Sequence, residues 1–180
     1  MASGNMKDIK RRIKSVQSTM QITKAMELVA SSKMRHAKER ALGARPYFNA
    51  LYQTITHLAG ATRGSESVYT RPREVKNSLY IVIAGDRGLA GGYNANLFKL
   101  AAAEMQGKQA QVITIGKKAQ EHYAKRPVTV AADYPGIAET MRISDTHPIV
   151  EDMLKLFREG KVDEVFLCYK EFISPLQQEP

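Results

Sequence analysis

The sequence predicts an α/β fold, with a long N-terminal coiled-coil helix joined to a Rossmann-like parallel α/β domain. Two observations lead to this prediction. Mostly apolar residues recur in alternating steps of four and three from Ile9 to Leu58, and this spacing is the period of a coiled-coil helix. From residue 77, short apolar runs alternate with helix-like segments, as in a parallel sheet with crossover helices. The predicted divisions are a helix over 1–60, a linker over 61–76 and the α/β domain over 77–180.

The predicted helix carries a seam at this spacing, which only Thr23 and Glu27 interrupt with polar side chains. A strict seven-residue repeat means that helices supercoil around a shared seam. The apolar members of the seam are Ile9, Ile13, Val16, Met20, Ala30, Met34, Ala37, Ala41, Ala44, Phe48, Leu51, Ile55 and Leu58. The alanine-rich middle allows close approach of a partner helix but buries little area per residue.

A helix with such a seam needs a partner. Fifty helical residues make a rod of about 75 Å, whereas a domain of about 100 residues is roughly 26 Å across, so we expect the helix to project. Gly43 and Pro46 lie within it, and we expect a bend where proline removes a backbone hydrogen bond. No other segment is both long enough and helix-patterned to cover the seam. We therefore expect the partner helix to be absent from this sequence.

The period changes after a polar stretch from Gly60 to Arg73 that is rich in turn-forming residues. Continuous apolar runs then predict strands covered on both faces. The predicted strands are Leu79–Ala84, Gln111–Ile115, Val128–Ala131 and Val165–Tyr169, and the predicted helices are Asn94–Met105, Lys117–Lys125 and a segment from Ser144 or Thr146 to Arg158. Asn94 or Asn96 is the expected cap of the first helix, and Gly160 is the expected stop of the last. The sequence ends at Pro180 without a closing helix, so we expect the domain to be truncated there.

Positive charge is concentrated at the N-terminal end. The net charge is +9, and residues 1–45 hold eleven Lys or Arg against three Asp or Glu. This arm therefore carries +8, and the rest of the chain +1. Three classes of partner fit such a field, namely nucleic acid, anionic lipid and an acidic protein surface. A merely solvated helix face is the simpler interpretation, and the unpaired seam beside the charge argues against it.

The composition excludes several classes of protein. No apolar run approaches the roughly 20 residues that span a bilayer. Cys168 is the only cysteine, which rules out an internal disulfide and favours a reducing compartment, and its apolar strand predicts a buried thiol. The first residues lack an apolar signal core, and a transit peptide is disfavoured because the helical pattern continues well beyond the length of one.

No residue is predicted to be catalytic, to bind a cofactor or to ligate a metal. The glycine loop after the first predicted strand has the spacing Gly85-x-x-Gly88-x-x-Gly91, which is neither GxGxxG nor a P-loop. Glycines also serve simply to turn the chain. Asp86 beside Arg87 is interpreted as a turn residue with a local ion pair. The four histidines lie in separate segments and lack the spacing of metal ligands; they are His36, His57, His122 and His147.

Two longer motifs carry a family resemblance. The segments Met20–Arg35 (MQITKAMELVASSKMR) and Gly85–Asn94 (GDRGLAGGYN) resemble the N-terminal helix and the glycine loop of the γ subunits of rotary F-type ATP synthases. Arg45–Tyr47 and Tyr169–Gln178 are also similar to that family, and the resemblance covers essentially the whole chain in matching order. Ala90 stands where the family often has a cysteine, so thiol-based regulation at this loop is not implied.

The resemblance implies a central-stalk rotor subunit and not an enzyme. In this family the N-terminal helix pairs antiparallel with a C-terminal helix inside a hexamer of α and β subunits, and its rotation couples ion flow through a c-ring to ATP synthesis or hydrolysis. The implied partners are the α and β subunits, the ε subunit and the c-ring, with no nucleic acid, no cofactor and no membrane span. The implied location is peripheral, on the cytoplasmic face of the bacterial inner membrane. The implied hexamer contacts are Met26, Lys33, Arg35, Arg40 and Arg87.

Two other interpretations stay open. A nucleotide-dependent α/β enzyme with a coiled-coil arm would bind a nucleotide specifically and saturably. A coiled-coil nucleic-acid binder, suggested by the charged arm, would lose affinity steeply as salt is added. No recognition-helix or aromatic motif in the sequence supports the nucleic-acid binder.

Overall fold

The computed structural model describes residues 2–61, 67–69, 71–174 and 177–180, with side chains described from residue 5 onward. The chain divides into two compact units, Met1–Glu66 and Ser67–Pro180, and each is described by itself. The linker predicted over residues 61–76 includes residues 62–66 and 70, which lie outside the described residues.

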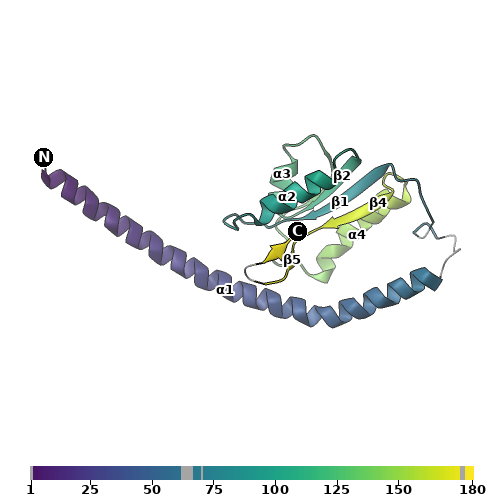
Figure 1. Cartoon of the computed structure of the whole chain (residues 1–180), viewed down its shortest axis with the longest axis horizontal. Coiled ribbons are helices and arrows are strands. Elements are labelled where there is room, and N and C mark those ends of the chain that lie inside the picture. Colours follow the sequence, from purple (N-terminus) through teal and green to yellow (C-terminus); the bar gives the residue numbers. More distant parts are fainter. Residues whose placement is uncertain (1, 62–66, 70, 175–176) are drawn as a thin grey trace. The chain divides into compact units, whose positions relative to one another are not determined.

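The first unit is one helix of 60 residues, α1 (Ala2–Ala61), which curves along its length (Figure 1). The chain stays helical across Gly43 and Pro46, although proline cannot donate the backbone hydrogen bond of a regular turn. Most of the remaining residues are good helix formers such as Ala, Lys, Arg, Met and Leu. The long helix predicted from the period of the sequence is confirmed.

A four-stranded parallel sheet forms the centre of the second unit. Its strands are β1 (Asn77–Ile83), β2 (Gln109–Ile115), β3 (Thr129–Tyr134) and β4 (Glu164–Cys168), in the order β3-β2-β1-β4. Five consecutive residues of β1 are buried, as expected of a central strand covered on both faces. A short antiparallel hairpin of β5 (Glu171–Phe172) and β6 (Gln178–Glu179) follows the sheet.

Helices cover both faces of this sheet (Figure 1). Helices α2 (Tyr93–Glu104) and α3 (Lys117–Tyr123) lie on one face, and α4 (Ile143–Arg158) lies on the other. Successive residues of a strand point to opposite faces. The core therefore has two layers: Tyr80 and Val82 pack with α2 and α3, whereas Leu79 and Ile81 pack with α4. The predicted α/β class and the parallel sheet are confirmed.

The predicted cap of α2 is wrong. The helix begins after Gly92, so Asn94 and Asn96 lie inside its first turns and neither side chain caps it. Asn94 Oδ1 instead accepts the backbone N–H of Gly85 at 3.0 Å. Asparagine is a common helix cap, but the side chain of Asn94 instead holds the glycine loop against α2. The local sequence does not reveal this role.

The predicted start of α4 also needs correction. Its first residue is Ile143, so Ser144 and Thr146 lie within the first turn and not at the cap. Asp145 supplies a hydrogen-bond acceptor at the start of this helix, because its Oδ2 accepts the backbone N–H of Arg142 at 2.8 Å. An acidic side chain at this position is also favourable to the helix dipole.

The predicted end of α4 is confirmed. Gly160 has a φ of +67°, a conformation that glycine adopts without steric cost. Its N–H donates to the carbonyl of Phe157 at 3.2 Å, and the next N–H, of Lys161, donates to the carbonyl of Leu156 at 3.0 Å. This pair of bonds is the Schellman motif, which closes a helix with a left-handed glycine.

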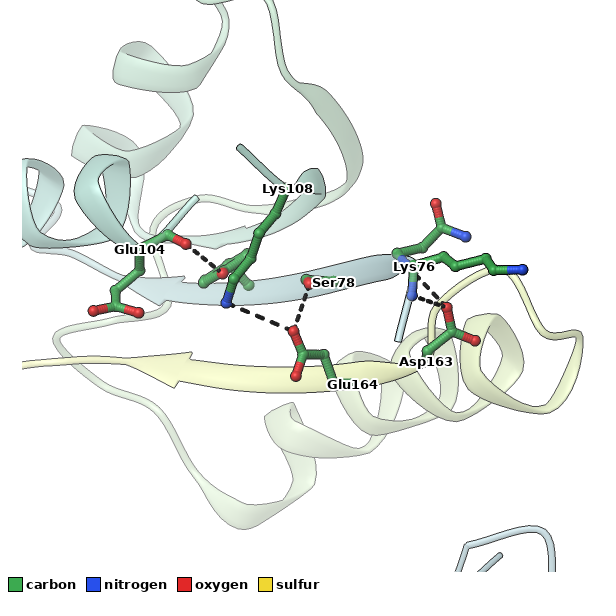
Figure 2. Close-up of polar contacts among 8 residues, drawn as sticks. Lys76, Ser78, Glu104, Lys108, Asp163 and Glu164 are labelled. Carbon is green, nitrogen blue, oxygen red and sulfur yellow. Dashed lines mark hydrogen bonds and ion pairs between the residues drawn. The ribbon is translucent and has the colours of Figure 1, made fainter. Parts of the chain in front are cut away.

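Polar contacts at the amino edge of the sheet hold the edge strand β4 to β1 (Figure 2). The carboxylate of Asp163 accepts the backbone N–H of Lys76 at 3.0 Å. Glu164 accepts the hydroxyl of Ser78 at 2.6 Å, and Lys108 Nζ lies 3.7 Å from the same carboxylate oxygen. The first residues of β4 are therefore fixed by side chains as well as by the strand ladder.

Gly116, which follows β2, packs directly against the end of β1. Its φ is +92°, and a Cβ at this position would lie 2.1 Å from the carbonyl oxygen of Ala84. We predict that Gly116→Ala lowers the free energy of unfolding by at least about 3 kcal/mol, because the left-handed backbone and the backbone clash both oppose it. Urea unfolding measures the loss.

Gly107→Ala is the matched control. Gly107 has a φ of +78°, but a Cβ there would meet nothing within 4 Å. We expect this variant to lose only about 1–2 kcal/mol, the cost of the left-handed conformation alone. Equal losses for the two variants would contradict the importance of the close approach at Gly116.

Candidate functional site

The surface of α1 presents large apolar side chains to solvent. Every residue from Asn5 to Ala61 is exposed, and the seam residues Phe48 and Leu58 are 61% and 55% exposed. Further exposed apolar residues lie outside the predicted seam, among them Ile22, Leu28 and Tyr47. Apolar surface on this scale indicates a face that docks against another segment or molecule.

The contact residues predicted on α1 lie on the two flanks of the seam. Met26, Lys33 and Arg40 are seven residues apart, so they share one stripe of the helix, and each directly precedes a seam position. Arg35 directly follows a seam position and lies on the other flank. All four are exposed. Arg87, the fifth predicted contact, belongs to the other unit.

One carboxylate joins the loops after three adjacent strands. Asp86 follows β1, and its Oδ1 accepts the backbone N–H groups of Lys117 at 2.9 Å and Gly136 at 2.8 Å. Its Oδ2 accepts the backbone N–H of Glu139 at 3.3 Å. Lys117 follows β2, whereas Gly136 and Glu139 follow β3. These contacts, which we call the Asp86 knot, fix the carboxyl edge of the sheet.

The knot favours the charged form of Asp86. Burial alone would raise the pKa of this carboxyl, but hydrogen bonds from backbone N–H groups, that of Lys117 foremost, hold its pKa below the ordinary value. The predicted local ion pair with Arg87 is wrong. Arg87 instead pairs with Glu139, with 3.2 Å between Nε and Oε2, and so adds a second bond between the same two loops.

The knot occupies the place where an α/β sheet commonly receives a phosphate. Ligands of such sheets bind outside the carboxyl ends of the strands, on backbone N–H groups at helix N-termini. Here the N–H of Lys117, the first residue of α3, already binds the carboxylate of Asp86. A phosphate would meet a like charge and lose that donor. The geometry therefore disfavours a nucleotide at this position.

The loop of Asp86 also exposes a leucine in an unusual conformation. Leu89 has a φ of 61° and is 94% exposed, and no other non-glycine residue of the described ranges has a positive φ. The sequence did not single out Leu89, because a loop with so many glycines does not show which residue takes the left-handed conformation. Its exposure likewise depends on contacts made by distant residues.

A cavity of about 620 Å³ opens at the amino edge of the sheet, beside the ends of α2 and α3. Its basic lining residues already have partners. Arg126 Nε donates to His122 Nε2 at 2.7 Å, and Lys108 Nζ lies 4.6 Å from the centre of the Phe166 ring. Burial, and then the charge of Arg126, lower the pKa of His122. These engaged side chains argue against an anion site in the cavity.

The single cysteine of the sequence lies in the core of the second unit. Cys168 is buried, as its apolar strand predicted, and burial raises the pKa of its thiol. In the part of the chain that the structure describes, no three His, Cys, Asp or Glu side chains gather so as to hold a metal ion. Within the same residues, no helix combines the length and the apolar character that crossing a bilayer requires.

Comparison with known proteins adds a family assignment. The model of a family described as ATP synthase matches residues 5–180. An ATP synthase gamma chain from Ruminococcus albus is 48% identical over 183 residues, which cover 98% of this chain and 63% of the relative. A gamma chain from Alkaliphilus metalliredigens is 44% identical, covering 97% and 61%, and a sodium ion specific gamma chain from Acetobacterium woodii is 41% identical, covering 97% and 58%. The chain thus spans about three fifths of the length of these relatives.

The Asp86 knot generates a prediction about acid stability. We expect Asp86→Asn to lower the free energy of unfolding by about 1–2 kcal/mol at neutral pH, because the amide keeps one acceptor but loses the charge. Folding lowers the pKa of Asp86, so its stabilisation is present above the unfolded value of 3.8 and is lost as the pH falls through the lower folded value. In urea unfolding, the difference from wild type should stay constant down to about pH 5 and shrink below about pH 4.

Glu151→Gln is the control for this measurement. It removes the same charge from an exposed position on α4, and surface changes of this kind stay within about 0.5 kcal/mol. A difference between wild type and Asp86→Asn that persisted unchanged to pH 2 would show that the charge of Asp86 does not carry the stabilisation.

Proposed function

This chain belongs to the ATP synthase family of gamma chains, and on that premise we propose that it is the central-stalk rotor subunit of an F-type ATP synthase. In this function α1 turns inside a hexamer of α and β subunits. Its rotation couples ion flow through the c-ring to ATP synthesis or hydrolysis. The chain acts as a subunit without an active site of its own, and the α and β subunits supply the catalytic residues.

One observation carries the proposal. A helix of 60 residues exposes a seam of large apolar side chains, and each Å² of such surface left in water costs about 25 cal/mol. A second helix packed along the seam would remove that cost, as in coiled coils. We propose that this partner is a C-terminal helix of the gamma chain and that the pair lies in the cavity of the hexamer.

The proposed hexamer contacts suit a turning shaft. Met26 lies at a bearing-like contact, and Lys33, Arg35 and Arg40 face acidic loops of the β subunits. Exposed charge pairs contribute only about 0–1 kcal/mol each, so no single rotary position is held strongly and the contacts exchange as the shaft turns. Torque then arises from differences in packing between the conformational states of the hexamer.

The α/β unit has a separate place in the proposal. We assign it a position outside the hexamer, against the ε subunit and near the c-ring, with Arg87 as a contact to the hexamer. This arrangement puts the chain peripherally on the cytoplasmic face of the bacterial inner membrane. The Asp86 knot favours this function over a nucleotide-dependent enzyme, because a carboxylate takes the position of a phosphate at the carboxyl edge.

Co-expression with α and β subunits tests the proposed function. A rotor subunit should copurify with the hexamer at one copy per three α and three β subunits, and the complex should hydrolyse ATP. A chain that stays monomeric in the presence of assembled α and β subunits, or that binds a nucleotide saturably by itself, would refute the proposal.

The flanking cations of α1 generate a prediction about coupling. We expect the combined variant Lys33→Ala, Arg35→Ala, Arg40→Ala to assemble normally and to keep most of its ATP hydrolysis. Coupling should loosen mildly, with ATP-driven ion pumping falling by about twofold to fivefold relative to hydrolysis, because each exposed pair contributes little. Parallel assays of hydrolysis and pumping in membrane vesicles give the ratio.

A second triple variant controls for charge. Lys99→Ala, Lys125→Ala and Arg158→Ala remove three positive charges from exposed positions of the α/β unit and should leave the ratio of pumping to hydrolysis unchanged. Complete loss of hydrolysis by the α1 variant would contradict the idea of weak, exchanging contacts. An equal effect of both triple variants would mean that coupling depends on the net charge of the chain and not on the positions of the three cations on α1.

A further inference from the structure

The segment that leads into β1 is fastened to the C-terminal end of α4 by one arginine. Residues 67–76, which we call the strap, belong to the second unit, and all of them except residue 70 are described. Arg73 Nη1 donates to the carbonyl of Phe157 at 3.0 Å, and its Nη2 donates to the carbonyl of Val68 at 3.2 Å. One guanidinium therefore joins the beginning of the strap to a residue 84 positions beyond Arg73.

The ring of Phe157 adds two further contacts. The guanidinium carbon of Arg73 lies 4.0 Å from the centre of this ring, within the range of a cation–π contact. The ring of Tyr69 stacks on it, with 6.1 Å between the ring centres and 12° between the ring planes. Phe157 itself packs against the apolar layer between α4 and the sheet. The strap is thus fastened to the core of the unit.

The position of Phe157 at the end of a helix explains why an arginine suits this contact. Its carbonyl belongs to the last turn of α4, where carbonyls lack a partner within the helix and carry the negative end of the helix dipole. This carbonyl accepts the N–H of Gly160 at 3.2 Å as well as Arg73. A lysine would keep the charge but lacks the planar fork that reaches two carbonyls while it stacks on a ring.

The other end of the strap is held separately. Asp163 Oδ2 accepts the backbone N–H of Lys76 at 3.0 Å (Figure 2) and that of Asn77 at 2.9 Å. The strap is therefore fixed at both of its ends. By comparison, a free segment of ten residues has an end-to-end distance of roughly 17 Å that fluctuates widely.

We propose that Arg73 is the positioning residue of a stiff joint, in which it locks the strap to α4 so that the α/β unit follows α1 when α1 turns. Along the chain, only residues 62–66 separate α1 from the strap. If the strap were released, its ten residues would add slack to the connection between the two units. The inference rests on the proposed function, since a joint of this kind matters for coupling only if α1 is a turning shaft.

Distances between α1 and α4 test the joint. Spin labels at Gln53→Cys and Glu151→Cys, both at exposed positions, report these distances by pulsed electron paramagnetic resonance, in the chain alone and in its complex with α and β subunits. Cys168 is buried and so reacts poorly with the label. We expect one narrow distribution of distances, which Arg73→Lys should widen by at least about twofold because the strap is released.

Two further variants sharpen the test. Tyr69→Ala removes only the stacked ring, at a residue 54% exposed, and should widen the distribution less than Arg73→Lys does. Arg71→Lys makes the same exchange at an exposed position of the same strap and should leave the distribution unchanged. Equal widening by Arg71→Lys and Arg73→Lys would overturn the role assigned to the Arg73 contacts.

Coupling supplies a readout that a purely structural role would not move. In membrane vesicles that hold the complex, Arg73→Lys should keep ATP hydrolysis but lower ATP-driven ion pumping by about threefold relative to it, because the slack of a free segment takes up part of each rotation. If Arg73 served only to stabilise the fold, Arg73→Lys would lower the melting temperature and leave the ratio of pumping to hydrolysis as in wild type.

The outcomes separate this inference from the proposed function. If the wild-type distribution is already broad, or if Arg73→Lys leaves it narrow, the stiff joint is refuted and the rotor proposal stands. If the distribution widens but the ratio of pumping to hydrolysis does not change, the joint has no part in coupling and the inference is also refuted. If wild type does not assemble with α and β subunits, the rotor proposal fails, and the distances in the chain alone still decide whether Arg73 stiffens the joint.

Discussion

A single α-helix has no interior, so the apolar side chains of α1 can leave water only against another segment or another molecule. The α/β unit is not limited in this way, because its sheet is covered by helices on both faces and buries two apolar layers. The two units therefore differ in what they need. The α/β unit has its own core, whereas the exposed apolar side chains of α1 favour packing against a partner, as the proposed function requires.

The Asp86 carboxylate gives the α/β unit its second distinctive property. Folds of this kind commonly use the carboxyl edge of the sheet to hold a ligand on backbone N–H groups. In this chain the carboxylate of Asp86 accepts hydrogen bonds from such N–H groups. The edge is therefore rigid, and these donors are not available to a phosphate. The same rigid edge carries the exposed side chains of Leu89 and Ile143.

Periodic features were predictable from the sequence, and long-range polar contacts were not. The seven-residue seam predicted α1, and continuous apolar runs predicted β1 to β4, because buried faces require apolar residues at regular positions along the sequence. Asn94 was mistaken for a cap because its partner lies in the preceding loop. The donors to Asp86 lie 31 to 53 residues further along the chain. Contacts between residues so far apart in the sequence leave no local pattern. The Asp86 knot and the exposure of Leu89 are therefore visible only in the folded structure.

The close approach at Gly116 determines which parts of the α/β unit can be changed. At this point the frame of the carboxyl edge is set by main-chain atoms, since the carbonyl of Ala84 leaves no room for a side chain. A scaffold defined by backbone proximity and one carboxylate tolerates exchange of the residues that it displays. Substitutions at exposed positions such as Leu89 or Ile143 therefore leave this main-chain frame in place, so that the surface of the unit can be varied without disturbing the arrangement beneath it.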